Sequence, residues 1–301
     1  MLIVKRHSKR MTMKKLIIMN FSGVYELEKF ADNPSAVHID CTHLTGTDCY
    51  CDQEAEQKIR SLIAPYPAEG IHFIDSGDYH YITEFWTDKL SGPFNLVLFD
   101  HHTDMQPPLF EGLLSCGSWV ESMLEHNPQL RKVVLFGIPE AQKRAIPSKF
   151  QDRVITYTDI QLHRHLQESR PLCLQEPIYI SVDKDVLDTR SAATNWDQGI
   201  LSLSELKQLL TLLLQHEKVL GVDICGECTD TIHQLSMDPA IQLDNEANSE
   251  LLTLLSQLSD NLCINKDIPA SSIHTDQRAN DTDRSRHIMQ GSTIHPFHAG
   301  D

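Results

Sequence analysis

Residues 97–106, VLFDHHTDMQ, join an apolar run to a cluster of acids and imidazoles. Continuous apolar runs are typical of strands buried on both faces, as in a parallel sheet covered by helices. Asp100, His102 and Asp104 follow at alternate positions, so an extended backbone would point them to one side and the intervening residues to the other. This stretch therefore predicts a buried strand that leads directly into a polar site.

Similar apolar runs alternate with helical patterns along the chain. They predict about eight strands, at residues 15–21, 35–40, 71–75, 95–100, 132–138, 153–158, 177–183 and 219–224. Residues 52–63 and 203–217 have amphipathic helical spacing, Ser202 and Glu205 fit a capping box, and another helix is expected after Ser249. The alternation predicts an α/β fold of three layers, α/β/α, with a mainly parallel sheet of about eight strands. In such sheets, ligands bind at the carboxyl ends of the strands.

Composition limits the domain count and the partners. The 301 residues, 41% of them hydrophobic, favour a single domain at residues 14–264, preceded by an extension at 1–13 and followed by a flexible polar tail at 265–301. A formal charge of -16 argues against nucleic acid or a membrane surface and favours a small cationic or neutral partner. The N-terminus lacks the features of a secretory signal, so a cytoplasmic location is expected.

Eight cysteines are scattered along the chain without the paired CxxC blocks of a zinc site. Reduced thiols are favoured over disulfides or structural zinc for all of them. Residues 40–51 follow an expected strand end and are positioned to overhang a site at the sheet edge. A plain loop is the favoured interpretation of this segment.

Three expected strands end in possible metal ligands. Asp183 and Asp185 follow one strand, and a turn at Gly77 delivers His80 after another. Together with residues 100–104, these segments supply four carboxylates and two imidazoles. Such a set would repel itself unless cations were bound, and two divalent ions would bring it close to neutrality. The mixture of oxygen and imidazole ligands favours Mn²⁺ over Zn²⁺, Co²⁺ or Fe²⁺. The alternative is that the acids are caps and solvated loop residues.

Five motifs, in order along the chain, resemble those of the arginase/agmatinase/formimidoylglutamase family of ureohydrolases. DHHTD at 100–104 is similar to D-A-H-x-D, SVDKDVLD at 181–188 to S-x-D-x-D-x-x-D-P, and GDYH at 77–80 to G-G-D-H. ATNWDQG at 193–199 resembles the glycine-ended loop on the substrate side, and VDICGE at 222–227 resembles a late strand that ends in glutamate. The family shares its fold with histone deacetylases.

The resemblance implies a binuclear hydrolase of linear C–N bonds in a guanidino or amidino compound. It implies two Mn²⁺ ions with a bridging hydroxide, and a ligand set consisting of His80, Asp100, His102, Asp104, Asp183 and Asp185. Asp104 would also orient the hydroxide or relay its proton. Glu227 would pair with the guanidinium, although it lies one residue later than the family pattern. Cys116 occupies the position where many members have a proton-shuttle histidine, and it acts there as a shuttle or only packs.

Other aspects of function stay open. No residues that grip the α-carboxylate of arginine are evident at positions 106–110, so arginine is not the expected substrate. A metal-dependent deacetylase-type amidohydrolase and a catalytically silent metal-binding or ligand-binding protein are the alternatives. Lys184, between the two aspartates, would face away from the metals and either offset their charge or reach solvent. Relatives form trimers or hexamers, so a homo-oligomer is possible.

Overall fold

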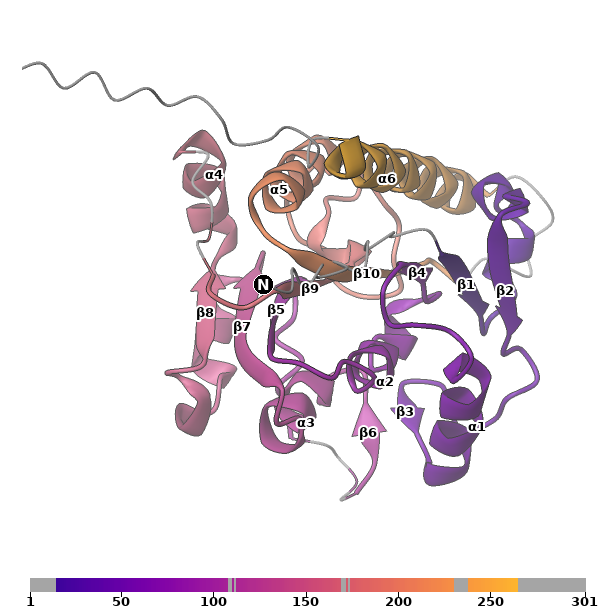
Figure 1. The fold of residues 1–301 in the computed structure, drawn as a ribbon, viewed down its shortest axis with the longest axis horizontal. Helices are drawn as coiled ribbons and strands as arrows, with labels where there is room; N and C mark the ends of the chain where they lie inside the picture. Colours follow the sequence, from indigo (N-terminus) through magenta and orange to yellow (C-terminus); the bar gives the residue numbers. More distant parts are fainter. Residues whose placement is uncertain are drawn as a thin grey trace, which may run out of the picture. The chain divides into compact units, whose positions relative to one another are not determined.

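The computed structural model describes residues 15–107, 110, 112–168, 172, 174–229 and 238–264. The expected N-terminal extension and polar tail lie outside these residues, and the domain boundaries remain predictions. Figure 1 shows the fold, in which helices lie on both sides of a central sheet. Within the described residues, no helix is long and apolar enough to cross a membrane.

The central sheet has eight strands, and every pairing between them is parallel. The strands are β1 (Leu16–Asn20), β2 (Ala36–Asp40), β4 (Ile71–Phe73), β5 (Phe94–Phe99), β7 (Leu130–Phe136), β8 (Val154–Tyr157), β9 (Ile178–Asp183) and β10 (Val219–Cys225). All eight predicted segments are confirmed, because buried parallel strands carry the continuous apolar runs by which they were recognised. The strand order is β2-β1-β4-β10-β9-β5-β7-β8.

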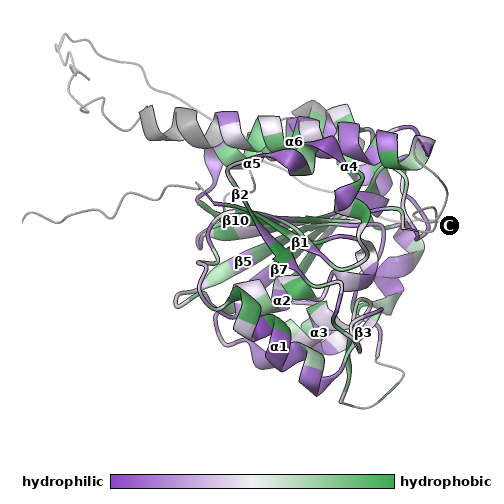
Figure 2. Cartoon of the chain, turned by 90° about the vertical axis from the view of Figure 1, so that its right-hand side faces the viewer, coloured by the Kyte–Doolittle hydropathy of each residue, from purple (hydrophilic) through white to green (hydrophobic). Residues whose placement is uncertain are grey.

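Three helices cover each face of the sheet, which confirms the predicted three layers (Figure 2). One layer contains α1 (Gln53–Ile63), α2 (Ile82–Thr87) and α3 (Trp119–His126), and the other contains α4 (Asp159–Glu168), α5 (Leu203–His216) and α6 (Pro239–Ile264). The predicted capping box at the start of α5 is present. Helix α6 begins ten residues before the expected Ser249, since its first turns bury the polar side chains Asp244 and Asn248 and show no apolar stripe.

Several short elements carry the connections. A two-stranded antiparallel sheet pairs β3 (Tyr50–Cys51) with β6 (Leu114–Ser115). These strands were not predicted, because two residues are too few to show a period. The 3₁₀ helices are η1 (Val24–Glu26), η2 (Lys29–Asp32), η3 (Gly77–Tyr79), η4 (Glu140–Ala145), η5 (Ser148–Phe150) and η6 (Lys184–Val186).

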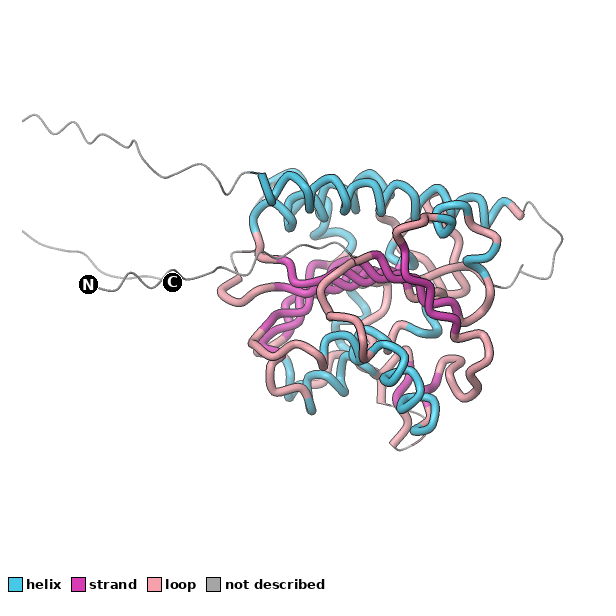
Figure 3. The backbone as a smooth tube through the Cα atoms, turned by 45° about the vertical axis from the view of Figure 1, so that its right-hand side comes forward, coloured by secondary structure: helices cyan, strands magenta, loops and turns pink. Residues whose placement is uncertain are grey.

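The four central strands position the candidate site. Strands β4, β10, β9 and β5 are neighbours in the sheet, and all run in the same direction. Their carboxyl ends therefore lie at one edge, where the loops drawn in pink in Figure 3 begin. The segments that carry the predicted ligands follow β4, β5 and β9, so the topology brings together residues more than 100 positions apart.

Candidate metal centre

His80 lies at the centre of a buried group of acids. It follows β4 through η3, and its Nδ1 lies 3.1 Å from Asp104 Oδ2, 3.4 Å from Asp100 Oδ2 and 3.5 Å from Asp183 Oδ2. The other ring nitrogen, Nε2, lies 2.9 Å from the Ser181 hydroxyl. A proton on Nε2 would leave the lone pair of Nδ1 facing the carboxylates, which is the arrangement of histidines that bind metals.

A second group adjoins the first through Asp100. His102 Nδ1 lies 2.7 Å from Asp185 Oδ2 and 3.6 Å from Asp100 Oδ1. One potential ligand atom from each of Asp100, His102 and Asp185 lies within 4.8 Å of the others, and the same holds for His80, Asp100 and Asp104. The structure thus brings all six predicted ligands together in two adjoining groups.

The backbone at these strand ends differs from the extended path that was expected. Asp104 has a φ of 50°, in the left-handed region, and its Oδ2 accepts a 2.6 Å hydrogen bond from Trp119 Nε1. After β9 the chain enters η6, where the Asp185 N–H donates to Asp183 Oδ1 at 2.9 Å. The convergence therefore depends on turns held by the acids themselves, in addition to strand alternation.

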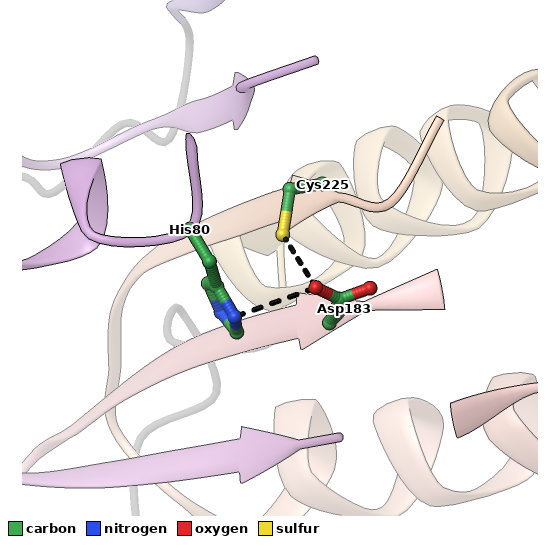
Figure 4. Close-up of side chains that lie close together, drawn as sticks. All are labelled: His80, Asp183 and Cys225. Carbon is green, nitrogen blue, oxygen red and sulfur yellow. Dashed lines mark hydrogen bonds and ion pairs between the residues drawn. The ribbon is translucent and has the colours of Figure 1, made fainter. Parts of the chain in front are cut away.

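Cys225 is a neighbour of this cluster that the sequence did not reveal. It ends β10, and its Sγ donates to Asp183 Oδ2 over 3.4 Å (Figure 4). Figure 4 also shows the His80 ring directed at the same carboxylate oxygen. His80, Asp183 and Cys225 form a third group whose potential ligand atoms lie within 4.8 Å of one another. A thiol at a strand end has no sequence pattern that distinguishes it from a packed cysteine.

The charges in the cluster shift one another's pKa values strongly. Burial and the charge of Asp185 raise the pKa of Asp183 to about 7, while burial and Asp100 raise that of Asp185 to about 6. Burial opposes protonation of His102, but hydrogen bonds to Asp100 and Asp185 outweigh it and raise its pKa to about 11. The buried atoms His80 Nδ1 and Asp100 Oδ2 have no hydrogen-bond partner. Buried ligand atoms that have no hydrogen-bond partner and lie beside carboxylates that repel one another are what a site for divalent cations requires.

A cavity of about 330 Å³ opens onto the cluster. Cys116 lies in its wall, as expected for a residue beside the site, and Cys49 and Tyr50 from the 40–51 loop also line it. Trp196 completes the aromatic part of the wall, and its Nε1 donates to Asp78 Oδ1 at 3.0 Å. The 40–51 loop therefore contributes to the cavity wall, and its Asp48 and Cys49 also form, with Asp78, a separate group of potential ligand atoms within 4.8 Å of one another.

Glu227 does not line this cavity, contrary to the role expected for it. It is fully buried, and its Oε2 accepts a 2.6 Å bond from Lys184 Nζ. Tyr25 Oη and Asn248 Nδ2 donate to its other oxygen at 3.1 and 2.9 Å. Lys184 also lies 3.0 Å from Asp244 and is itself buried, so the option that it reaches solvent is wrong. An internal lysine thus occupies the carboxylate that was expected to bind a guanidinium.

The residue before Glu227 explains this displacement. Gly226 has a φ of 99°, and a Cβ at this position would lie 2.5 Å from Asp183 Oδ1. Only glycine fits so close to that carboxylate without a shift. Position 226 therefore has no side chain that could bind a substrate. The glutamate one residue later points into the network around Lys184 instead.

Comparison with known proteins agrees with this fold. The model of the Arginase family matches residues 70–228, just over half of the 301-residue chain and all of the segments that form the cluster. The chain belongs to the arginase family. This arginase-family protein is also 30% identical over 210 residues to an uncharacterized protein of Thermotoga maritima, covering 70% of the chain and 78% of that relative.

Solved structures share the fold of this arginase-family protein at low identity. Formimidoylglutamase of Bacillus subtilis matches with a TM-score of 0.59 at 16% identity, over 82% of this chain and 87% of its own. Proclavaminate amidino hydrolase of Streptomyces clavuligerus matches with a TM-score of 0.60 at 17% identity, over 83% and 92%. An arginase-like protein of T. brucei matches with a TM-score of 0.59 at 13% identity, over 90% and 93%.

Proposed function

We propose that this protein is a hydrolase that uses two divalent ions, Mn²⁺ foremost, to cleave a linear C–N bond of a guanidino or amidino compound. The observation that carries the proposal is the cluster of four carboxylates and two imidazoles around Asp100, at the base of a cavity. Membership of the arginase family supports the same reaction class.

The residues around the cavity have different proposed roles. His80, Asp100, His102, Asp104, Asp183 and Asp185 would hold the ions. When bound, divalent ions lower the pKa of water enough to supply a nucleophile near neutral pH. Asp104, fixed by Trp119, is positioned to orient that nucleophile and accept its proton. Cys116 lies in the cavity wall, where its thiol can donate a hydrogen bond to a departing amine.

The cavity wall argues for a substrate other than arginine. No lysine or arginine is present among the described residues that line it, so those residues offer neither side chain to pair with an α-carboxylate. Tyr50, Pro107 and Trp196 offer apolar and aromatic contacts instead. Glu227 forms an ion pair with Lys184 and is not free to bind substrate. We therefore expect the metal-ligand cluster and the aromatic residues of the cavity wall to recognise the guanidino or amidino group.

The test combines metal content with a substrate panel. Full-length protein would be reconstituted with Mn²⁺, its metal content measured, and agmatine, guanidinobutyrate, formimidoylglutamate and arginine offered, with urea, formamide and ammonia as readouts. We expect close to two ions per chain and turnover of a compound other than arginine, abolished in D104N.

Three results would count against the proposal. Absence of bound transition metal after reconstitution would contradict it outright. Release of acetate from acylated polyamines, without urea or ammonia, would favour a deacetylase-type reaction. Full metal occupancy with no turnover across a broad panel would favour a silent binding protein.

A further inference from the structure

Two cysteines face each other in the wall of the cavity. Strand β3 pairs with β6 through Tyr50↔Ser115 and Cys51↔Leu114, so Cys49 and Cys116 are the next residues opposite one another. The Cys116 N–H donates to the Cys49 carbonyl oxygen at 2.9 Å, which extends the pairing by one step. Both residues line the cavity and both are free thiols.

Their side chains are also in contact. A hydrogen bond to the Cys49 thiol, together with burial, raises the pKa of the Cys116 thiol. The Cys49 thiol in turn donates to Asp78 Oδ1 over 3.2 Å. Cys49 has a φ of 54°, in the left-handed region, which is unusual for a residue other than glycine. The fold therefore holds the two sulfurs together at some cost in backbone strain.

The spacing of such a pair suits a disulfide. Directly opposite residues in an antiparallel pair have Cα atoms about 4.5–5.5 Å apart. Disulfides span Cα distances of about 4.4–6.8 Å, so the backbone need not move to allow the bond. Neither residue belongs to the six-residue cluster around Asp100, although Cys49 Sγ forms a separate group of potential ligand atoms with Asp48 and Asp78. Each cysteine is only half-buried, which leaves the sulfurs within reach of a small oxidant from the cavity.

We propose that Cys49 and Cys116 are a reversible oxidative modification site, forming a disulfide across the cavity wall. With a diazene oxidant, one thiolate adds to the N=N bond and the second thiolate displaces the resulting adduct. An S–S bond forms, the two thiols lose two protons and two electrons, and the diazene is reduced to the hydrazine. The bond removes both S–H groups from the cavity wall and ties β3 to β6, whose residues Tyr50 and Ser115 line the same cavity.

Other cysteine pairs in the described chain are less well placed. Cys225 is 1% exposed, and its sulfur contacts Asp183, so the Cys225–Cys228 pair would have to leave the buried cluster to react. Cys51 lies in the same strand as Cys49 but is buried and donates to the Asp52 carbonyl. A search for the bond should nevertheless follow every pair.

The experiment uses the full chain, with and without Mn²⁺, treated with diamide. Intact mass should fall by two hydrogen masses, and a peptide map without reduction should contain a Cys49–Cys116 cross-link that dithiothreitol removes. C49S and C116S should each lose this cross-link, while C228S, a matched change at another half-buried cysteine, should retain it. Circular dichroism of each variant checks that it is folded, and the two independent serine variants guard against failure of either one.

Clear results would overturn the proposal. One is that native protein keeps both thiols after diamide treatment, as measured by alkylation and mass. Another is that the bond maps to Cys225–Cys228 or Cys49–Cys51 and persists in C116S. These outcomes do not depend on enzymatic turnover, so they are separate from the test of the proposed hydrolase.

Discussion

Two charged clusters adjoin the end of β9, and they differ in whether a lysine pairs with their acids. Asp183 and Asp185 contribute to the cavity side, which we call the open cluster and which also contains His80, Asp100, His102 and Asp104. Lys184, between them in sequence, belongs to the other side, which we call the closed cluster and which also contains Glu28, Glu227 and Asp244.

The closed cluster contains a lysine that pairs with two of its acids. Burial opposes the charge on Lys184, but Asp244 and Glu227 outweigh it and raise the pKa of the ammonium. Burial and the charge of Glu227 raise the pKa of Glu28 to about 10, so this carboxyl is protonated at neutral pH and adds no charge. Burial also raises the pKa of Asp244, to about 6, despite its ion pair with Lys184.

The open cluster has imidazoles where the closed cluster has a lysine. Among the described residues, no lysine or arginine forms an ion pair with any of its four aspartates. In the metal-free protein these aspartates pair with the imidazoles of His80 and His102, which must lose their protons to bind a metal, whereas Lys184 keeps its charge between its acids. The comparison indicates that one side of the strand end is built to receive cations and the other is built to stay closed.

The largest effect should come from D183N, which removes the acid that lies beside both His80 and Cys225. We expect Mn²⁺ affinity to fall by on the order of 100-fold or more, because both the charge and a ligand oxygen are lost. In the metal-free protein the same change removes repulsion, so the free energy of unfolding should rise. Isothermal titration with Mn²⁺ and urea denaturation measure the two effects. Unchanged Mn²⁺ affinity would contradict the proposal that the open cluster binds Mn²⁺. D188N, which changes an aspartate just outside the cluster, is the control.

K184M should break the closed cluster. Losing the ammonium leaves Glu227 and Asp244 buried without a cation, which we expect to lower the free energy of unfolding by about 3–5 kcal/mol. The triple variant K184M/E227Q/D244N should recover much of that loss. Lys207 pairs with Glu250 at 2.7 Å but at the surface, so K207M should cost about 0–1 kcal/mol. Equal losses in K184M and K207M, by urea denaturation, would contradict this account.

The sequence predicted the open cluster because its parts lie at strand ends. A buried parallel strand is recognisable from its apolar run, and the topology of such sheets brings their carboxyl ends together. Asp100 and Asp183 could therefore be placed at one edge without knowledge of the strand order. The turn at Asp104 was not predictable, because its left-handed backbone depends on the contact with Trp119.

The closed cluster was not predictable, because its partners are distant in sequence and carry no pattern. Lys184 pairs with residues 227 and 244, which lie on β10's exit and on α6. The local sequence around a lysine between two aspartates does not show which acids its ammonium group pairs with. Glu227 was assigned to the wrong side for a related reason, since the effect of Gly226 on the chain direction depends on its close approach to Asp183.

Glu84 sharpens the comparison, because it is a buried acid outside both clusters and has no ion pair among the described residues. Burial, and then the charge of Asp88, raise its pKa to about 8, and its Oε2 has no hydrogen-bond partner. The folded protein therefore holds this proton more tightly than the unfolded chain, so stability falls as pH rises from about 4.5 to about 8 and is level above that.

E84Q should remove this dependence. Relative to the natural protein, the variant should gain about 2–4 kcal/mol at pH 9 and little at pH 4.5, measured by urea denaturation across the range. E54Q, at an exposed position of α1, should show no comparable change with pH. A gain that is the same at both ends of the pH range would contradict the assignment of the proton to Glu84.

The smallest effect should come from Y25F, which removes a neutral member of the closed cluster. Tyr25 Oη donates to Glu227 Oε1 at 3.1 Å and accepts from the Asp75 N–H at 2.8 Å. Its loss removes two hydrogen bonds but leaves Lys184 and its acids paired, so we expect a cost of about 1–2 kcal/mol. Y66F, in the turn after α1, should cost less than about 0.5 kcal/mol. If Y25F cost as much as K184M, hydrogen bonding rather than charge pairing would organise the closed cluster, and the contrast with the open cluster would lose its electrostatic basis.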